Sequence, residues 1–137
     1  EISFPGGARH DDDPDLATTA LRETEEEIGI PAASIQLHGR LDDFWSIHGY
    51  HVVPFVGTIP HPFTYRVADY EIAALIEAPL EHFRAPGVHH VEDWTHQGRV
   101  PPVDFYRYGE HVIWGLTAAI LRQFLEITDP AARERQP

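Results

Sequence analysis

The stretch "RETEEEIGI", residues 22–30, places one arginine and four glutamates in its first six positions and then reaches a glycine. At about 100° per residue on a helix, Glu23 and Glu27 lie one above the other at the border of the apolar stripe. Glu26 lies about 60° to the solvent side of them. Glu25 points away, and we expect it to be an ordinary solvated residue.

The other three glutamates would destabilise the helix if they formed only a solvent-exposed acidic surface. Like charges at i, i+4 destabilise a helix by roughly 0.2–0.5 kcal/mol, and the C-terminal end of the helix dipole also disfavours negative charge. Arg22 can offset one of them, most naturally Glu26 at i+4. Carboxylates that converge at the edge of a packed face are the oxygen ligands that Mg²⁺ and Mn²⁺ prefer. We therefore predict a Mg²⁺ or Mn²⁺ site at Glu23, Glu26 and Glu27, with a simple acidic surface as the alternative.

Helix-start and helix-stop signals bound this segment. Asp13 has the residue type of an N-cap, Pro14 suits the first helical position and Asp15 the first turn. The helix is expected to run to about Ile28, because Gly29 is a typical C-terminal stop. The predicted inward face comprises Leu16, Ala17, Ala20, Leu21, Thr24 and Ile28.

Further along, apolar patterns and turn residues predict strands and a second helix. The segment 70–80 mixes strand and helix signals. Strands are expected over residues 34–41 and 50–59, a helical turn over 81–83, a strand pair over 88–95 and 100–108, and a helix over 111–128. The apolar face of this last helix comprises Ile113, Leu116, Ile120, Leu121 and Phe124.

This order of elements predicts an α/β protein of the α+β type, with a mixed sheet between helices. We expect one domain over residues 1–128 and a frayed tail over 129–137. Because the chain opens on "EISFPGG", already inside an apolar strand and without methionine, we expect the first strands of the domain to be missing.

Composition narrows the function. The chain has 137 residues, 42% of them hydrophobic, and a formal net charge of -12. No basic stripe exists to replace the counterions of a nucleic acid, and no run approaches the ~20 apolar residues of a membrane span. Cysteine is absent, which excludes disulfides and thiolate chemistry and suits a cytoplasmic protein. None of the ten histidines lies in an array typical of zinc sites.

The residues "GG…RETEEEIG" resemble the Nudix box, G-x5-E-x7-R-E-U-x-E-E-x-G-U, where U is a bulky apolar residue. The second half of the box matches position for position, except that Thr24 replaces an aliphatic residue. Counting back from Arg22 puts Pro14 at the first acid of the pattern. Counting forward from Gly7 puts Asp13 there, with a loop one residue longer. We interpret Asp13 as the helix cap.

A narrower resemblance covers most of the chain. The segments "ISFPGG", "ATTALRETEEEIGI", "GYHVVPFVG", "YEIAALIEAPL" and "VIWGLTA" together are similar to the coenzyme A diphosphatase (CoA pyrophosphatase) branch of the Nudix hydrolases. The resemblance implies a hydrolase of acid anhydrides in phosphorus-containing substrates. Its expected substrate is coenzyme A or a derivative, and its products are 4'-phosphopantetheine and 3',5'-ADP. It also allows a homodimer.

The resemblance also implies roles for individual residues. Glu23 and Glu27 would be metal ligands, with the Gly7 carbonyl as a further ligand. Glu26 would be a ligand or the base that deprotonates water, and Arg22 would orient the carboxylates.

Outside the box, Glu71 is the candidate for a second base, with a solvated strand-end glutamate as the alternative. Phe44, Trp45 and Tyr50 are candidates for binding adenine and pantetheine, or else ordinary core or rim aromatics. The cations available for a 3'-phosphate are Arg9, Arg40 and Arg66.

Two other functions remain open at this point. One keeps the chemistry and changes the substrate to another nucleoside diphosphate derivative, such as ADP-ribose, NADH or a dinucleotide. The other is a non-catalytic binding module that retains the Nudix fold.

Overall fold

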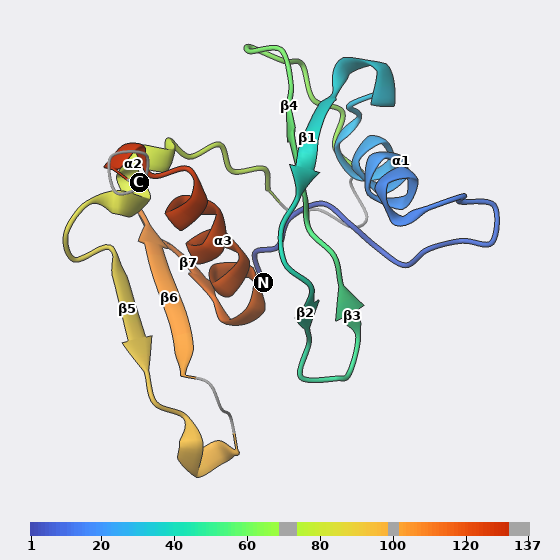
Figure 1. Ribbon diagram of the computed structural model, residues 1–137. Helices are drawn as coiled ribbons and strands as arrows, with labels where there is room; N and C mark the ends of the chain where they lie inside the picture. The colour runs from blue at the N-terminus through green and yellow to red at the C-terminus, as the bar shows by residue number, and fades with distance from the viewer. Residues whose placement is uncertain (69–73, 99–101, 132–137) are drawn as a thin grey trace. The chain divides into compact units, whose positions relative to one another are not determined.

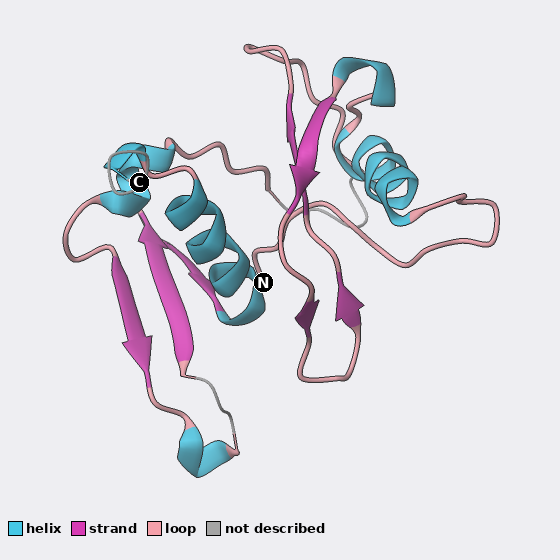
Figure 2. Cartoon of the chain, in the orientation of Figure 1, coloured by secondary structure: helices cyan, strands magenta, loops and turns pink. Residues whose placement is uncertain are grey.

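Figures 1 and 2 show a computed structural model that describes residues 1–68, 74–98 and 102–131. The chain divides into two compact units, which are described separately. Unit 1 is Glu1–Ser3, Ser46–Gly49 and Glu77–Pro137, and unit 2 is Phe4–Trp45 and Tyr50–Ile76.

The main helix of unit 2, α1 (Leu16–Ile28), begins at Asp15. The Asp15 side chain accepts a hydrogen bond from the Thr18 backbone N–H at 2.8 Å. The prediction that Asp13 caps this helix is therefore wrong, and the helix begins two residues later than the Asp-Pro pair suggests. The reason is that the Asp15 carboxylate can accept a hydrogen bond from the Thr18 N–H, which has no partner within the helix. The Asp13 side chain binds other groups.

The predicted stop at Gly29 is confirmed. Gly29 adopts a left-handed conformation with φ 76°, and its N–H donates to the Glu25 carbonyl at 2.9 Å. Two backbone N–H groups from a distant segment complete this end of the helix: Arg66 N–H donates to Ile28 O at 3.0 Å, and Ala68 N–H to Glu27 O at 2.9 Å. Three carbonyls at the C-terminus of α1, those of Glu25, Glu27 and Ile28, are thus satisfied by backbone N–H groups, and no basic residue lies in its last turn.

The strands of unit 2 are short and antiparallel. β1 (Gln36–Arg40) pairs with β4 (Phe55–Thr58) through a bulge between Leu37 and Gly39. β2 (Phe44–Trp45) pairs with β3 (His51–Val52) as a hairpin. The strand expected over residues 50–59 is interrupted at Pro54, because proline has no N–H to donate to a sheet. Unit 2 also contains η1 (Ala32–Ser34).

Unit 1 contains a three-stranded antiparallel sheet in the order β5 (His89–Glu92), β6 (Val103–Tyr108), β7 (His111–Trp114). The helix α3 (Gly115–Ile127) lies on this sheet. The predicted strand pair is confirmed by the register of His89 opposite Tyr106. The prediction of the second helix is wrong for its first four residues. These residues form β7, which pairs with β6 so that Tyr106 lies opposite Ile113. Unit 1 also contains α2 (Leu80–Arg84) and η2 (Thr95–Gln97).

The error at β7 has a local cause. The run Val112-Ile113-Trp114 is β-branched and aromatic, which favours a strand, and Gly109 at φ 59° supplies the preceding turn. Ile113 is buried as expected, but as a strand residue. The core of unit 1 is formed by Phe83, Tyr106, Ile113, Ala118, Leu121 and Leu125.

The α+β class is confirmed by this mixture of helices and strands. Within the described ranges the strands pair only antiparallel and form three small sheets, where the pattern predicts one mixed sheet. The single domain over residues 1–128 stays a prediction. No described helix has both the length and the apolar character needed to cross a membrane.

The unit 1 core predicts a stability difference along α3. Leu121 is 5% exposed and Ile127 on the same helix is 61% exposed. Leu121→Ala should lower the free energy of unfolding by about 2–5 kcal/mol, because it leaves a cavity in the core. Ile127→Ala should stay within about 0.5 kcal/mol of the wild type. Urea unfolding followed by circular dichroism measures both, and equal losses would contradict this core.

Candidate metal and active site

Arg22 lies at the centre of the acidic face of α1. Its Nη1 donates to Glu23 Oε1 at 3.1 Å and to both Glu26 carboxylate oxygens at 3.2 Å. Its Nη2 donates to the Ala8 carbonyl at 3.1 Å and to Asp13 Oδ2 at 3.0 Å. One guanidinium therefore joins two predicted site carboxylates to the loop that precedes the helix.

Asp13 is the buried partner of this arginine. It is 4% exposed and also accepts hydrogen bonds from the His10 N–H and the Thr19 hydroxyl, each at 2.9 Å. The hydrogen bond from Arg22, then those from His10 and Thr19, hold the pKa of Asp13 well below its ordinary value, although burial opposes them. The same contact with Asp13 is the main cause of the raised pKa of Arg22.

Sequence reasoning missed this role because it assigned Asp13 to the helix cap. The signal was present in the forward spacing, since Asp13 stands six residues after Gly7, where the Nudix pattern has its first acid. The longer loop leaves the carboxylate within reach of Arg22. Charge-assisted hydrogen bonds of this kind are about twice as strong as neutral ones.

The glycine turn packs directly on the acidic helix. The Gly6 N–H donates to Glu27 Oε1 at 3.0 Å. A Cβ added at Gly7 would lie 2.5 Å from Glu23 Cδ, so the Glu23 carboxylate would have to move aside. Glycine at this position therefore lets the main chain lie close to the Glu23 carboxylate without displacing it.

The donor set fits a divalent cation in its chemistry. It offers three carboxylates, of which Glu23 is 16% and Glu26 53% exposed in the side chain, beside a main chain that approaches closely at Gly7. Within the part of the chain that the structure describes, no three His, Cys, Asp or Glu side chains already form a metal-binding group. Glu23 and Glu26 turn to Arg22, and Glu27 to Gly6. A cation would take over some of these contacts.

Comparison with known proteins decides the family. A model of the NUDIX domain matches residues 1–108. The chain belongs to the Nudix family.

Relatives within the family have similar sequences. The protein named "Uncharacterized Nudix hydrolase NudL" from Photorhabdus laumondii is 37% identical over 126 residues, which cover 92% of this chain and 67% of that protein. Proteins of the same name from Escherichia coli and Shigella boydii are also 37% identical, over 134 residues that cover 90% of this chain and 64% of theirs. The chain thus spans about two thirds of the length of these relatives. Membership of the family and these names support the expected class, a Nudix pyrophosphohydrolase.

The Nudix domain carries the three aromatic candidates on the hairpin of β2 and β3. Phe44 is half-buried, whereas Trp45 is 66% and Tyr50 71% exposed. Trp45 stacks on His51 with ring centroids 4.8 Å apart, and His51 Nε2 lies 2.8 Å from Asp43 Oδ2. The hydrogen bond to His51 is the main cause of the lowered pKa of Asp43. This hairpin is therefore ordered by local contacts while two of its aromatic rings face solvent.

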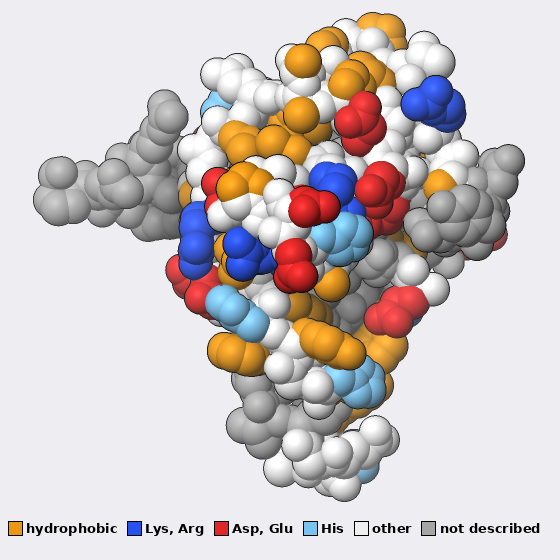
Figure 3. All heavy atoms as spheres, turned by 90° about the vertical axis from the view of Figure 1, so that its right-hand side faces the viewer, with side chains coloured by type: hydrophobic (Ala, Val, Ile, Leu, Met, Phe, Trp, Pro, Cys, Tyr) orange, Lys and Arg blue, Asp and Glu red, His pale blue; other side chains and the backbone are white. Residues whose placement is uncertain are grey.

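The remaining candidate residues differ in their contacts. Arg9 donates to the carbonyls of Asp13 at 3.1 Å and Pro14 at 3.4 Å, so it holds the loop. Arg40 pairs with Asp43. Glu71 lies outside the described residues, and its role stays a prediction. On the face drawn in Figure 3, acidic and basic side chains lie next to one another.

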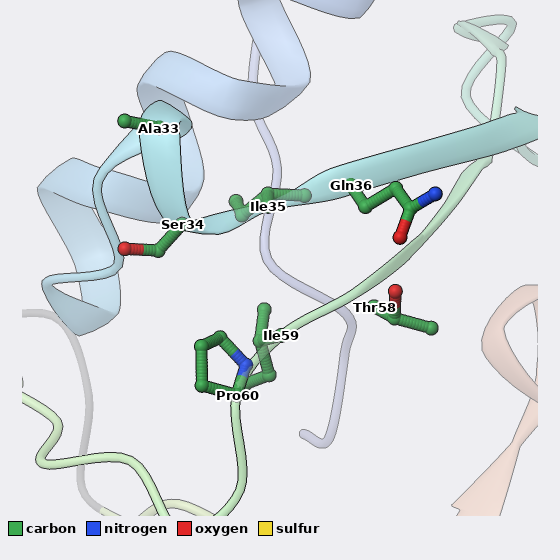
Figure 4. Close-up of a pocket in the computed structure, with 7 residues that line it drawn as sticks. All are labelled: Ala33, Ser34, Ile35, Gln36, Thr58, Ile59 and Pro60. Carbon is green, nitrogen blue, oxygen red and sulfur yellow. The ribbon is translucent and has the colours of Figure 1, made fainter.

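The structure has two clefts in the described parts of the chain whose linings include no residue of α1. The first, of about 360 Å³, lies between the start of β1 and the end of β4 (Figure 4), and its lining residues are Ala33, Ser34, Ile35, Gln36, Thr58, Ile59 and Pro60. None of these side chains ionises, so the cleft is a poor site for a cation.

The second cleft, of about 630 Å³, lies in unit 1. Its wall includes His89 and Arg122, which both hold the buried Asp104, at 2.7 and 3.0 Å. His89 also stacks on Tyr106, whose pKa burial raises to about 12. Because Asp104 already has two cationic or hydrogen-bonding partners, we interpret this cluster as structural.

The depressed pKa of Asp13 predicts a pH dependence of stability. A carboxyl whose pKa is lower in the folded state stabilises fully above its ordinary value of about 3.9 and loses this contribution as the pH falls through the folded-state value. Wild-type protein in EDTA should therefore lose stability between about pH 5 and pH 2. Asp13→Asn should be less stable at neutral pH and show a shallower decline.

Asp12→Asn is the matched control, because Asp12 is exposed and adjacent. Urea midpoints across the pH range measure all three proteins. Parallel curves for the wild type and Asp13→Asn would show that Asp13 is not the buried anchor.

Proposed function

We propose that this chain hydrolyses the pyrophosphate bond of coenzyme A or its derivatives in a Mg²⁺- or Mn²⁺-dependent reaction. The observation that carries the proposal is the assembly of Arg22, Glu23 and Glu26 beside a glycine turn that also binds Glu27. Family membership supports the reaction class, and the resemblance along the chain supports the substrate. The products would be 4'-phosphopantetheine, or its acyl form, and 3',5'-ADP.

Each site residue would have a role that follows from its position. Glu23 and Glu27 flank the glycine turn and would hold the cation together with the Gly7 carbonyl. The bound cation would neutralise phosphoryl oxygens and lower the pKa of a water molecule. Among the three carboxylates that pair with Arg22, Glu26 has the most exposed side chain, so it is suited to accept the proton from that water. Arg22 would keep Glu26 and Glu23 in place.

Substrate contacts are proposed on the β2–β3 hairpin. Trp45 and Tyr50 expose apolar ring surface that a substrate could cover, and Phe44 supports the base of the hairpin. Aromatic rings of this kind supply the apolar walls of small-molecule sites. Glu71 is proposed as a further proton acceptor. We also propose that the protein acts in the cytoplasm on a small molecule, without nucleic-acid or membrane partners, and forms a homodimer.

Turnover tests the proposal directly. With Mg²⁺ or Mn²⁺ and coenzyme A, mass spectrometry should detect 4'-phosphopantetheine and 3',5'-ADP. Glu26→Gln and Glu27→Gln should each lower kcat by at least roughly 100-fold, as expected for a lost general base or ligand. Glu25→Gln is the matched control and should retain wild-type activity, because Glu25 is exposed on the same helix and lies outside the proposed site.

Other outcomes would select another function. Turnover of ADP-ribose, NADH or a dinucleotide with coenzyme A untouched would assign a different nucleoside diphosphate substrate. Binding of a diphosphate without any turnover would indicate a non-catalytic module.

Removal of metal gives a separate prediction. EDTA should abolish the turnover, and added Mg²⁺ or Mn²⁺ should restore it, because the carboxylates cannot by themselves neutralise a diphosphate. Full activity after exhaustive chelation, with residual metal measured by mass spectrometry, would contradict the metal-dependent reaction.

A further inference from the structure

Thr19 is a buried polar residue outside the predicted inward stripe of α1. It is 3% exposed. A buried threonine within a helix usually donates its hydroxyl hydrogen to the carbonyl four residues earlier. Thr24 on the same helix does so, donating to Ala20 O at 2.7 Å.

Thr19 uses its hydroxyl differently. The carbonyl four residues earlier, that of Asp15, lies at 3.3 Å, whereas Asp13 Oδ2 lies at 2.9 Å. The hydroxyl has only one hydrogen to donate. The shorter contact to a charged acceptor takes precedence, because charge-assisted hydrogen bonds are the stronger ones. Thr19 is therefore attached to the loop rather than to its own helix.

Arg22 also donates to the oxygen that Thr19 binds, and its Nε donates to the other oxygen, Asp13 Oδ1, at 3.2 Å. Asp13 Oδ2 accepts from Arg22 Nη2 at 3.0 Å. Thr19 and Arg22 are three residues apart and so lie on the same side of the helix. The helix thus holds two donors at a fixed spacing, and both converge on one carboxylate oxygen.

The other side of the Arg22 guanidinium, at Nη1, contacts the predicted site carboxylates. Arg22 Nη1 donates to Glu23 Oε1 at 3.1 Å and to Glu26 at 3.2 Å. Because the guanidinium is planar and rigid, fixing its Asp13 side also fixes the position of Nη1.

We propose that Thr19 is a positioning residue that sets the places of the Glu23 and Glu26 carboxylates through Asp13 and Arg22. This inference rests on the proposed function. Thr19 would touch neither substrate nor cation.

The test compares variants at two threonines of one helix. Thr19→Val removes the hydroxyl at nearly constant shape, Thr19→Ser keeps it, and Thr24→Val removes the hydroxyl that donates to the helix backbone. Titration with Mn²⁺ alone, followed by electron paramagnetic resonance, should show roughly ten-fold weaker binding for Thr19→Val, the size expected when a supporting residue of a metal site is lost. Thr19→Ser and Thr24→Val should bind like the wild type.

Kinetics and NMR add readouts that a general loss of stability would not produce. Thr19→Val should lower kcat for coenzyme A with little change in KM, and the Arg22 Nε–H signal should broaden or move. Asp13→Asn, which weakens the same acceptor, should shift all three measurements in the same direction and serves if Thr19→Val fails to fold. Equal Mn²⁺ affinity and an unchanged Arg22 signal in Thr19→Val would overturn the inference.

Failure of the proposed function is distinguishable from failure of this inference. If the wild type hydrolyses no diphosphate, the proposed function fails, while the Arg22 Nε–H signal of Thr19→Val still supports or overturns the positioning role. If the wild type hydrolyses coenzyme A and Thr19→Val matches Thr24→Val in every measurement, only the positioning role is wrong.

Discussion

The ion pair between Arg22 and Asp13 is the interaction on which the candidate site depends. It joins a helix to the loop before it, at 3.0 Å and with the carboxylate almost fully buried. An uncompensated buried carboxylate is expensive, so the loop and the helix favour one arrangement. That arrangement directs the remaining guanidinium donor at Glu23 and Glu26, and it leaves the glycine turn over the same face. Arg22 therefore connects Glu23 and Glu26 to the loop, and the buried Asp13 fixes the position of Arg22 itself.

Sequence alone predicted much of this region, because its signals are local. The spacing of the glutamates, the stop at Gly29 and the partnership of Arg22 with Glu26 all follow from helix geometry and were found where the periodicity places them. The role of Asp13 was not predicted. Two aspartates compete for the helix start, and only the three-dimensional path of the loop decides that Asp15 caps it while Asp13 turns toward Arg22. Thr19 was missed for a related reason, since helical periodicity counts a threonine as marginal, and its burial comes from a partner outside the helix.

The strand errors have a different origin. Pro54 divides a continuous apolar run because of a missing N–H, which is visible in the sequence but was outweighed by the hydropathy. The run around Ile113 is apolar at both strand and helix spacing, and pairing with Tyr106, a tertiary contact, selects the strand. Hydrophobic periodicity could not predict the solvent exposure of Trp45 and Tyr50, since the two strands of the β2–β3 hairpin have only two residues each and so show no periodic pattern.

The closure of α1 at its C-terminal end has an electrostatic consequence. The carbonyls of Glu25, Glu27 and Ile28 are met by amide hydrogens of Gly29, Ala68 and Arg66. Main-chain amides thus complete the hydrogen bonding at this end, whereas a lysine or arginine side chain in the last turn, which α1 lacks, is the common solution. The negative end of the dipole and the carboxylate of Glu27 consequently act in the same direction, and both favour a cation near this end of the helix.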